Sequence, residues 1–383
     1  MMAAAGNTGT STYELFGWGD GGGGSVGDGT VTNRSSPVQI GTAFFGELDV
    51  TDLYATECRI TNGKTASGVV KADGTLWTWG NAYLGQTGHN NSTNTSSPVQ
   101  VGSLTDWRSV SNSLDSYGAM VATKTDGTLW GWGQKVASGH TSTIYSSPVQ
   151  VGTATDWSPY IGAGNNYAYC LKTNGELWMW GAGDAYVGVG TYLTGTPTQY
   201  TDKYFSYMGV GPNNAIFGVE KTTGKLWSWG TNNSWGFLGH NNTTSISSPV
   251  QIGTATDWAW AAGGWTSFTF GKTTRDAYGV GRNDDGYLGL DNTTTYSSPV
   301  QLADKGWANA GHGSSYNRLH MMASDGGLWA MGGSGGDGTS GTGSVDRHSS
   351  PVQVGSLTDW ICISNAGGGG RTVTSVKLAI RKS

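Results

Sequence analysis

The stretch Asp73-Gly74-Thr75-Leu76-Trp77-Thr78-Trp79-Gly80 decides the fold, because its pattern recurs along the chain at a nearly fixed interval. The core of the pattern is Leu-Trp-any residue-Trp-Gly, and its final glycine stands at Gly80, Gly133, Gly181 and Gly230. Degenerate copies end at Gly19, Gly281 and Gly332. Successive copies are 61, 53, 48, 49, 51 and 51 residues apart. A period near fifty residues is typical of repeat architectures, in which each repeat forms one supersecondary unit.

Two further motifs keep the same period. The motif Ser-Ser-Pro-Val-Gln places its proline at Pro37, Pro98, Pro148, Pro249, Pro299 and Pro351, with Thr196-Pro197-Thr198-Gln199 as the divergent copy. The motif Asp-Trp or Gly-Trp ends in Trp107, Trp157, Trp258, Trp307 and Trp360. The glycine and proline series both count seven copies, so we expect seven structural units.

Each repeat has the pattern of several short strands separated by tight turns. Asp73-Gly74, Asp126-Gly127 and Asn174-Gly175 precede the Leu-Trp motif, and glycine there supplies the positive φ that a tight hairpin needs. No apolar pattern of period 3.6 is long enough for a helix. The two tryptophans of Leu76-Trp77-Thr78-Trp79 are two residues apart and share a strand face. Because 15 of the 18 tryptophans occupy periodic positions, we interpret them as core between neighbouring sheets.

The two ends of the chain complement each other. The first copy, Leu15-Phe16-Gly17-Trp18-Gly19, lacks the preceding strand and turn, whereas Val373 to Ile380 forms a strand pattern with no following motif. The sequence therefore predicts an all-β, seven-bladed β-propeller with four-stranded antiparallel blades, in which both termini share one blade and close the ring. We expect residues 1–12 to be an N-terminal segment and residues 13–383 to be a single propeller domain.

Composition narrows the classes of partner. Only 12% of residues are charged, the formal net charge is −5, and no basic run is present, so we expect no nucleic-acid binding. No apolar run approaches the roughly 18 residues of a membrane span, and the N-terminus lacks the pattern of a signal peptide, so we expect no membrane insertion. Cys58, Cys170 and Cys362 lack metal-ligand spacing and are interpreted as reduced, buried thiols.

The residues that could carry catalysis or bind metal do not form a recognisable constellation. None of the six histidines has an acidic or nucleophilic residue at a sequence spacing that is typical of a catalytic site. Two stretches match GxGxxG, beginning at Gly17 and Gly333, but neither opens a helix in a βαβ unit. Asp284-Asp285-Gly286 lacks the alternating acidic series of a calcium loop. We therefore predict a protein that is not an enzyme and that uses no cofactor and no metal.

The three repeated motifs together resemble those of a known family, the regulator of chromosome condensation repeat. The matching elements include Trp79-Gly80-Asn81, Trp229-Gly230, Leu238-Gly239, Gly286-Tyr287-Leu288-Gly289 and the Ser-Ser-Pro-Val-Gln copies. The resemblance implies a seven-bladed propeller that presents loops to protein partners. Members of the family include exchange factors for a small nuclear GTPase, secreted bacterial inhibitors of β-lactamase, and short-repeat proteins of bacteria and phages. The only long insertion, around Phe44 to Cys58, does not match the wedge of the exchange factor.

Comparison of the repeats with each other identifies candidate contact residues, since a scaffold position should recur while a recognition position is free to differ. The position before Ser-Ser-Pro differs between copies and includes the candidates Arg34, Tyr145, Ile246, Tyr296 and His348. An exposed turn that tolerates any residue would give the same variation. Three tryptophans fall outside the periodic positions and are further candidates for partner contact: Trp235, Trp260 and Trp265.

The sequence thus predicts a non-enzymatic structural or binding protein. We expect a bacteriophage virion component, a tail or capsid-associated propeller whose partners are virion proteins or a host surface receptor, present in several copies. Its location would then be the virion, with the cytoplasm as the alternative. Two other functions stay open: a regulator of a GTPase or another enzyme through the propeller loops, and a carbohydrate-binding adhesin.

Overall fold

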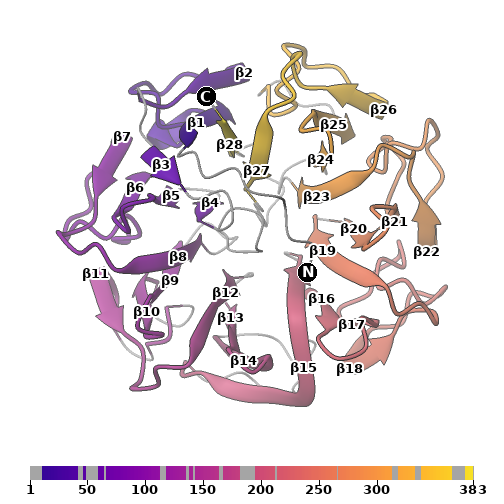
Figure 1. Ribbon diagram of the computed structural model, residues 1–383, viewed down its shortest axis with the longest axis horizontal. Helices are drawn as coiled ribbons and strands as arrows, with labels where there is room; N and C mark the ends of the chain where they lie inside the picture. The colour runs from indigo at the N-terminus through magenta and orange to yellow at the C-terminus, as the bar shows by residue number, and fades with distance from the viewer. Residues whose placement is uncertain are drawn as a thin grey trace.

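Short antiparallel sheets surround a central axis like the blades of a propeller (Figure 1). The computed structural model describes residues 11–41, 46–48, 59–63, 66–112, 118–134, 138–140, 143–163, 167–181, 195–211, 214–264, 266–312, 318–332, 338–364 and 376–382. Each blade consists of four strands, which we name a to d from the centre of the ring outward. The Leu-Trp motif forms strand c and the Ser-Ser-Pro-Val-Gln motif forms the outermost strand d. The predicted all-β propeller is confirmed.

The strands are numbered in chain order. Blade 2 is formed by β4 (Ile60–Asn62), β5 (Ala66–Val70), β6 (Leu76–Gly80) and β7 (Thr95–Gln100). Blade 3 is formed by β8 (Trp107–Asn112), β9 (Ala119–Lys124), β10 (Leu129–Gly133) and β11 (Tyr145–Gln150). Blade 6 is formed by β19 (Trp258–Gly263), β20 (Ser267–Lys272), β21 (Ala277–Gly281) and β22 (Tyr296–Gln301). Blade 7 is formed by β23 (Trp307–His312), β24 (Arg318–Ala323), β25 (Leu328–Gly332) and β26 (His348–Gln353).

Blades 4 and 5 share one long strand. Blade 4 contains β12 (Trp157–Ala163), β13 (Tyr167–Lys172), β14 (Glu176–Gly181) and the first part of β15 (Thr198–Val210). The second part of β15 is strand a of blade 5, followed by β16 (Ala215–Glu220), β17 (Leu226–Gly230) and β18 (Ile246–Gln251). The two blades therefore form one seven-stranded sheet, and counting them separately gives seven blades.

Blade 1 is built from both ends of the chain. Strands β27 (Trp360–Ile363) and β28 (Val376–Lys382) come from the C-terminal end, and β1 (Ser11–Gly19) and β2 (Arg34–Gln39) come from the N-terminal end. The antiparallel register of β1 and β28 runs from Tyr13 opposite Lys382 to Gly19 opposite Val376. The predicted closure of the ring is confirmed. A short strand β3 (Gly46–Leu48) from the inserted segment pairs with the start of β1, while residues 49–58 lie outside the described part.

The paired tryptophans differ in their burial. The second of each pair is fully buried, and the indoles of Trp79 and Trp132 each donate to a backbone carbonyl in the loop of the preceding blade. The first, such as Trp77 or Trp130, is only partly buried. The interpretation of these tryptophans as core is confirmed for the second one, while the first one, such as Trp77 or Trp130, packs against the edge of the core.

Each blade also docks on the next through its loops. The loop between strands c and d, the c–d loop, lies on strand d of the following blade, and the amide of Asn90 donates to the carbonyl of Ser146 at 2.7 Å. A Cβ added to Gly85 would lie 2.5 Å from Ser146 Cα, so only glycine permits this approach. On the opposite side, the amide of Trp107 donates to the carbonyl of Gly74 in the turn of blade 2. These repeated backbone contacts explain why glycine and serine recur at fixed positions.

Helical structure is limited to one 3-10 turn, η1 (Gly22–Gly24), within the described residues. No helix in that part of the chain has the length and apolar character needed to cross a membrane.

Candidate functional site

The ring has two faces that differ in the loops they carry. Strand c begins at the hairpin turn that follows strand b and ends at the c–d loop, so these two connections lie at opposite ends of each blade. The face with the b–c turns also carries the connections from strand d to the next blade, because Trp107 bonds to the turn at Gly74. A partner on one face would therefore leave the other face accessible.

Five of the candidate contact residues occupy one structural position. Arg34, Tyr145, Ile246, Tyr296 and His348 each begin an outermost strand and lie opposite the last glycine of strand c. They are therefore brought to the outer edge of the ring at the c–d loop end (Figure 1).

These five side chains are partly buried, not freely exposed. Arg34 forms an ion pair with Asp28 at 2.5 Å, and the ring of Tyr145 contacts that of His140 at a centroid distance of 4.7 Å. His348 Nε2 lies 3.3 Å from Thr342 Oγ1. Each contact joins the first residue of strand d to the c–d loop of its own blade. The residue type at this position therefore differs together with the c–d loop that it contacts. A contact role for these residues with a partner stays a prediction.

The c–d loops of four consecutive blades carry an exposed apolar side chain each. In blades 7, 1, 2 and 3 these are Val345 (51% exposed), Val31 (67%), Tyr83 (57%) and Ile144 (49%). We call these four residues the apolar rim. Single exposed apolar residues are common on protein surfaces, but their repetition on the same loop of adjacent blades makes these four residues candidates for partner contact. Sequence comparison missed them because an isolated valine or isoleucine in a polar loop gives no periodic signal.

The c–d loops of blades 5 and 6 carry charged and aromatic groups, and Arg347 of the blade 7 loop contacts them. The guanidinium of Arg282 lies 5.1 Å from the ring centre of Trp235 and forms an ion pair with Asp284 at 2.7 Å. The hydroxyl of Tyr287 donates to Asp285 at 2.6 Å, and Asp285 also pairs with Arg347 of blade 7. Trp235 is thus partly covered by Arg282, and its contact with a partner stays a prediction.

The other two unusual tryptophans are placed differently. Trp260 is 6% exposed and packs between blades 6 and 7 with Leu319 and Met321. Its expected contact role was therefore wrong, because the ring fills space next to Gly271, where a Cβ would collide with it. Trp265 lies outside the described residues.

On the face with the b–c turns, a lysine covers the aromatic rings in several blades. Lys172 Nζ lies 4.1 Å from the centre of the Trp157 ring and 5.2 Å from that of Trp178, and it pairs with Asp156. Lys124 makes the same contacts in blade 3, at 4.9 Å from Trp107 and 4.4 Å from Trp130. Cation–π contact with a neutralising aspartate explains how the partly buried tryptophans Trp130 and Trp178 are tolerated.

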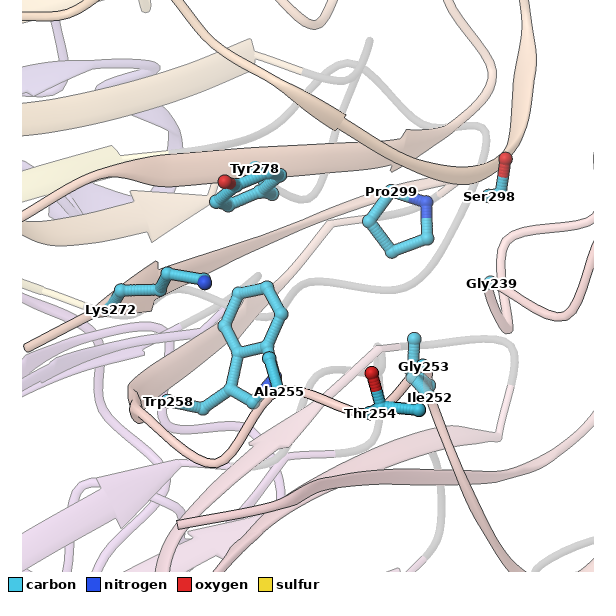
Figure 2. Close-up of a pocket in the computed structure, with 10 residues that line it drawn as sticks. All are labelled: Gly239, Ile252, Gly253, Thr254, Ala255, Trp258, Lys272, Tyr278, Ser298 and Pro299. Carbon is cyan, nitrogen blue, oxygen red and sulfur yellow. The ribbon is translucent and has the colours of Figure 1, made fainter.

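A pocket of about 330 Å³ opens on this face between blades 5 and 6. Figure 2 shows Tyr278 and Pro299 along one wall, Lys272 and Trp258 on a second, and Thr254 with Ile252 on a third. Lys272 pairs with Asp257 at 3.1 Å, so its charge is already balanced. The pocket contains no nucleophile paired with a base, and its lining offers apolar contact with a few hydroxyl groups.

No group of three potential metal ligands among histidine, cysteine, aspartate and glutamate occurs in the described ranges. Burial raises the pKa of the Cys170 thiol far above its ordinary value, so that thiol stays protonated and poorly nucleophilic. Cys362 is partly buried and not part of a disulfide, and Cys58 lies outside the described residues.

Comparison with known proteins agrees with this geometry. The model of the regulator of chromosome condensation (RCC1) repeat matches residues 73–113 and 223–270. The chain carries RCC1 repeats in these two segments. The E3 ubiquitin-protein ligases HERC2 of Homo sapiens and of Mus musculus are each 31% identical over 124 residues, which are 32% of this chain and 2% of those ligases. The RCC1-repeat chain thus matches a small fraction of the length of these relatives.

Solved structures resemble the RCC1-repeat propeller over nearly its whole length. Prp20p of Saccharomyces cerevisiae is similar with a TM-score of 0.77 and 18% identity, over 97% of this chain and 92% of that protein. Human WBSCR16 is similar with a TM-score of 0.76 and 15% identity, over 97% and 99% of the two chains. At these identities the likeness establishes the shared propeller fold.

Proposed function

We propose that this RCC1-repeat propeller is a non-enzymatic binding protein that holds a protein partner on its c–d loop face. The apolar rim carries the proposal, because it places exposed Val345, Val31, Tyr83 and Ile144 on the same loop of four adjacent blades. These loops are held by backbone hydrogen bonds to the next blade, such as Gly29 to Ser96 and Gly343 to Ser35, both at 2.8 Å. A rigid loop loses little conformational entropy when a partner binds.

The residues next to the rim support protein recognition as well. Trp235, Arg282 and Tyr287 continue the same face into blades 5 and 6, and tryptophan, tyrosine and arginine are the residues most enriched at binding hot spots. Prp20p, a protein of the same fold, has been described with its binding properties to Gsp1p and histones, and yeast RCC1 (Prp20) as bound to Kap60. By analogy we take a protein as the partner of this chain.

The proposal is tested by replacing the apolar rim with serine at all four positions and quantifying, by mass spectrometry, the proteins retained from the native source. We expect the partner to be lost. The control replaces Val99, Val250 and Val352, which are also exposed but lie on the outermost strands, and should retain it. Equal retention by both variants would contradict the proposal.

More narrowly, we propose that the partner belongs to a larger assembly and that this assembly is a bacteriophage particle, with virion proteins or a host receptor as partners. The low charged fraction of 12% and the multiplicity of equivalent loops suit a component that is held by several weak contacts. The phage assignment rests on the resemblance to short-repeat family members. Mass spectrometry of purified particles tests it, since we expect the chain among the particle proteins and its absence would contradict the assignment.

A second candidate function is regulation of a GTPase. The observation in its favour is the likeness to Prp20p, whose described partners include Gsp1p. Nucleotide-exchange assays with purified small GTPases distinguish the two functions, because a binding protein should leave the exchange rate unchanged.

A further inference from the structure

A second pocket of about 330 Å³ spans the boundary of blades 3, 4 and 5 on the face with the b–c turns. Three basic side chains line it: Arg108 of β8, Lys172 of β13 and Lys221, which directly follows β16. No aspartate or glutamate is among the described residues of its lining. Three basic residues in one pocket are unexpected in a chain whose formal net charge is −5.

Comparison of equivalent positions shows that two of these charges, those of Arg108 and Lys221, are replaced by uncharged residues in most other blades. Arg108 follows the tryptophan that begins strand a, where the other blades have Ser158, Ala259, Ala308 and Ile361. Lys221 donates its amide to the carbonyl before strand a, as Lys382 does in blade 1, whereas threonine or serine makes this bond in four other blades, through Thr125, Thr173, Thr273 and Ser324. Residues that recur serve the scaffold, so neither Arg108 nor Lys221 is required by it.

The basic groups of the pocket differ in the interactions that they make with the protein. Lys172 is held over Trp157 and paired with Asp156, as its equivalents are in blades 3 and 6. Lys221 Nζ donates to the carbonyl oxygens of Thr173 at 3.3 Å and Asn174 at 3.2 Å, which carry no net charge. Its ammonium group forms no ion pair within the described residues and keeps an unbalanced charge at the pocket.

The remaining lining adds hydrogen-bond donors and an apolar base. The hydroxyl-bearing residues Ser158, Thr173 and Ser206 line the pocket, and the buried side chains of Leu171 and Phe205 lie beneath them. Charge interactions are stronger beside such apolar surface than in bulk water. We propose that this pocket binds an oxyanion, a carboxylate or phosphate group, with Arg108 and Lys221 as the recognising cations. The site lies on the face opposite the apolar rim and does not depend on the proposed function.

Isothermal titration calorimetry of the full chain at low ionic strength tests this proposal with two probes, inorganic phosphate and a hexaglutamate peptide. The variants Arg108→Ser and Lys221→Thr introduce the residue that another blade has at the same position, so both should fold. Charge-assisted hydrogen bonds contribute enough that each variant should weaken binding about tenfold or more. Lys225→Thr removes a nearby charge that does not line the pocket and should bind as the parent does.

Binding of either probe that is weakened by both variants but not by the control supports the proposal and identifies the source of the anion. Phosphate alone would indicate a small phosphate ligand, and hexaglutamate alone would indicate an acidic protein segment. The proposal is overturned if neither probe binds, or if the Arg108→Ser and Lys221→Thr variants bind as tightly as the parent. A melting transition measured for every variant confirms that the fold is retained.

Discussion

The indole nitrogen of Trp18 donates a hydrogen bond of 3.2 Å to the backbone carbonyl of Thr339, a residue 321 positions away in the chain. The same contact joins Trp79 to Ser25 and Trp132 to Gln86 at other blade boundaries, at 3.0 and 2.9 Å. The ring is therefore closed by the same interaction that joins its consecutive blades, in addition to the pairing of β1 with β28.

Removal of residues 373–383 should abolish the cooperative melt, because it deletes β28 from the middle of blade 1. The truncation exposes the edges of β27 and β1 and opens the cores on both sides, since Leu378 and Ile380 pack toward blade 2 and Ala379 toward blade 7. Size-exclusion chromatography and calorimetry should show aggregation or loss of the transition. A soluble truncation with an unchanged melting temperature would rule out closure as a requirement for stability.

Gly85→Ala should destabilise the propeller more than Gly102→Ala. Both glycines have positive φ, 72° and 62°, so each alanine incurs backbone strain of about 1 kcal/mol. At Gly85 the new Cβ would also lie 2.5 Å from Ser146 Cα, whereas nothing lies within 4 Å of one at Gly102. Urea unfolding of the two variants measures the difference. Equal midpoints would show that the c–d loop does not dock tightly on the next blade.

The stability of the propeller should depend on pH through Lys377, which is fully buried on β28. Burial lowers the pKa of Lys377 to about 7 from an ordinary value of 10.5. Between these values the unfolded chain binds one proton more than the folded chain, so the free energy of unfolding should rise with pH, by about 1.4 kcal/mol per unit.

Urea unfolding between pH 7.5 and 9.5 measures this slope. Lys377→Met should remove the contribution, so the advantage of the methionine variant over the parent should shrink as the pH rises. Lys221→Met, which removes an exposed charge, serves as the control and should keep the slope of the parent. Parallel pH profiles for the parent and Lys377→Met would contradict a lowered pKa.

The fold could be predicted from the sequence because its determinants are periodic. The glycine at the b–c turn has the expected positive φ, as at Gly74 (75°) and Gly127 (77°). The incomplete repeat at Leu15 matched the unpaired strand pattern near Ile380, which located the shared blade. The continuous strand β15 was not predicted, because the divergent copy around Pro197 hides the boundary of blades 4 and 5.

The candidate site was less predictable, since burial and neighbours depend on the assembled ring. Trp235 and Trp260 both interrupt the repeat in the sequence, yet one lies in a c–d loop under Arg282 and the other fills the core beside Gly271. The apolar rim and the cluster of Arg108 with Lys221 come from single residues in different repeats. Only their positions in the folded chain show that they share a surface.

The most direct test of the central claim, that a protein partner binds the c–d loop face, is a pair of photo-crosslinking experiments. A photoreactive phenylalanine analogue replaces either Tyr83 (57% exposed, on the c–d loop face) or Tyr204 (44% exposed, opposite Glu176 near the b–c turn). Irradiation in the native source should give a discrete crosslinked protein at position 83 and none at position 204. A crosslink at position 204 alone, or none at either position in the presence of the bound partner, would contradict the account.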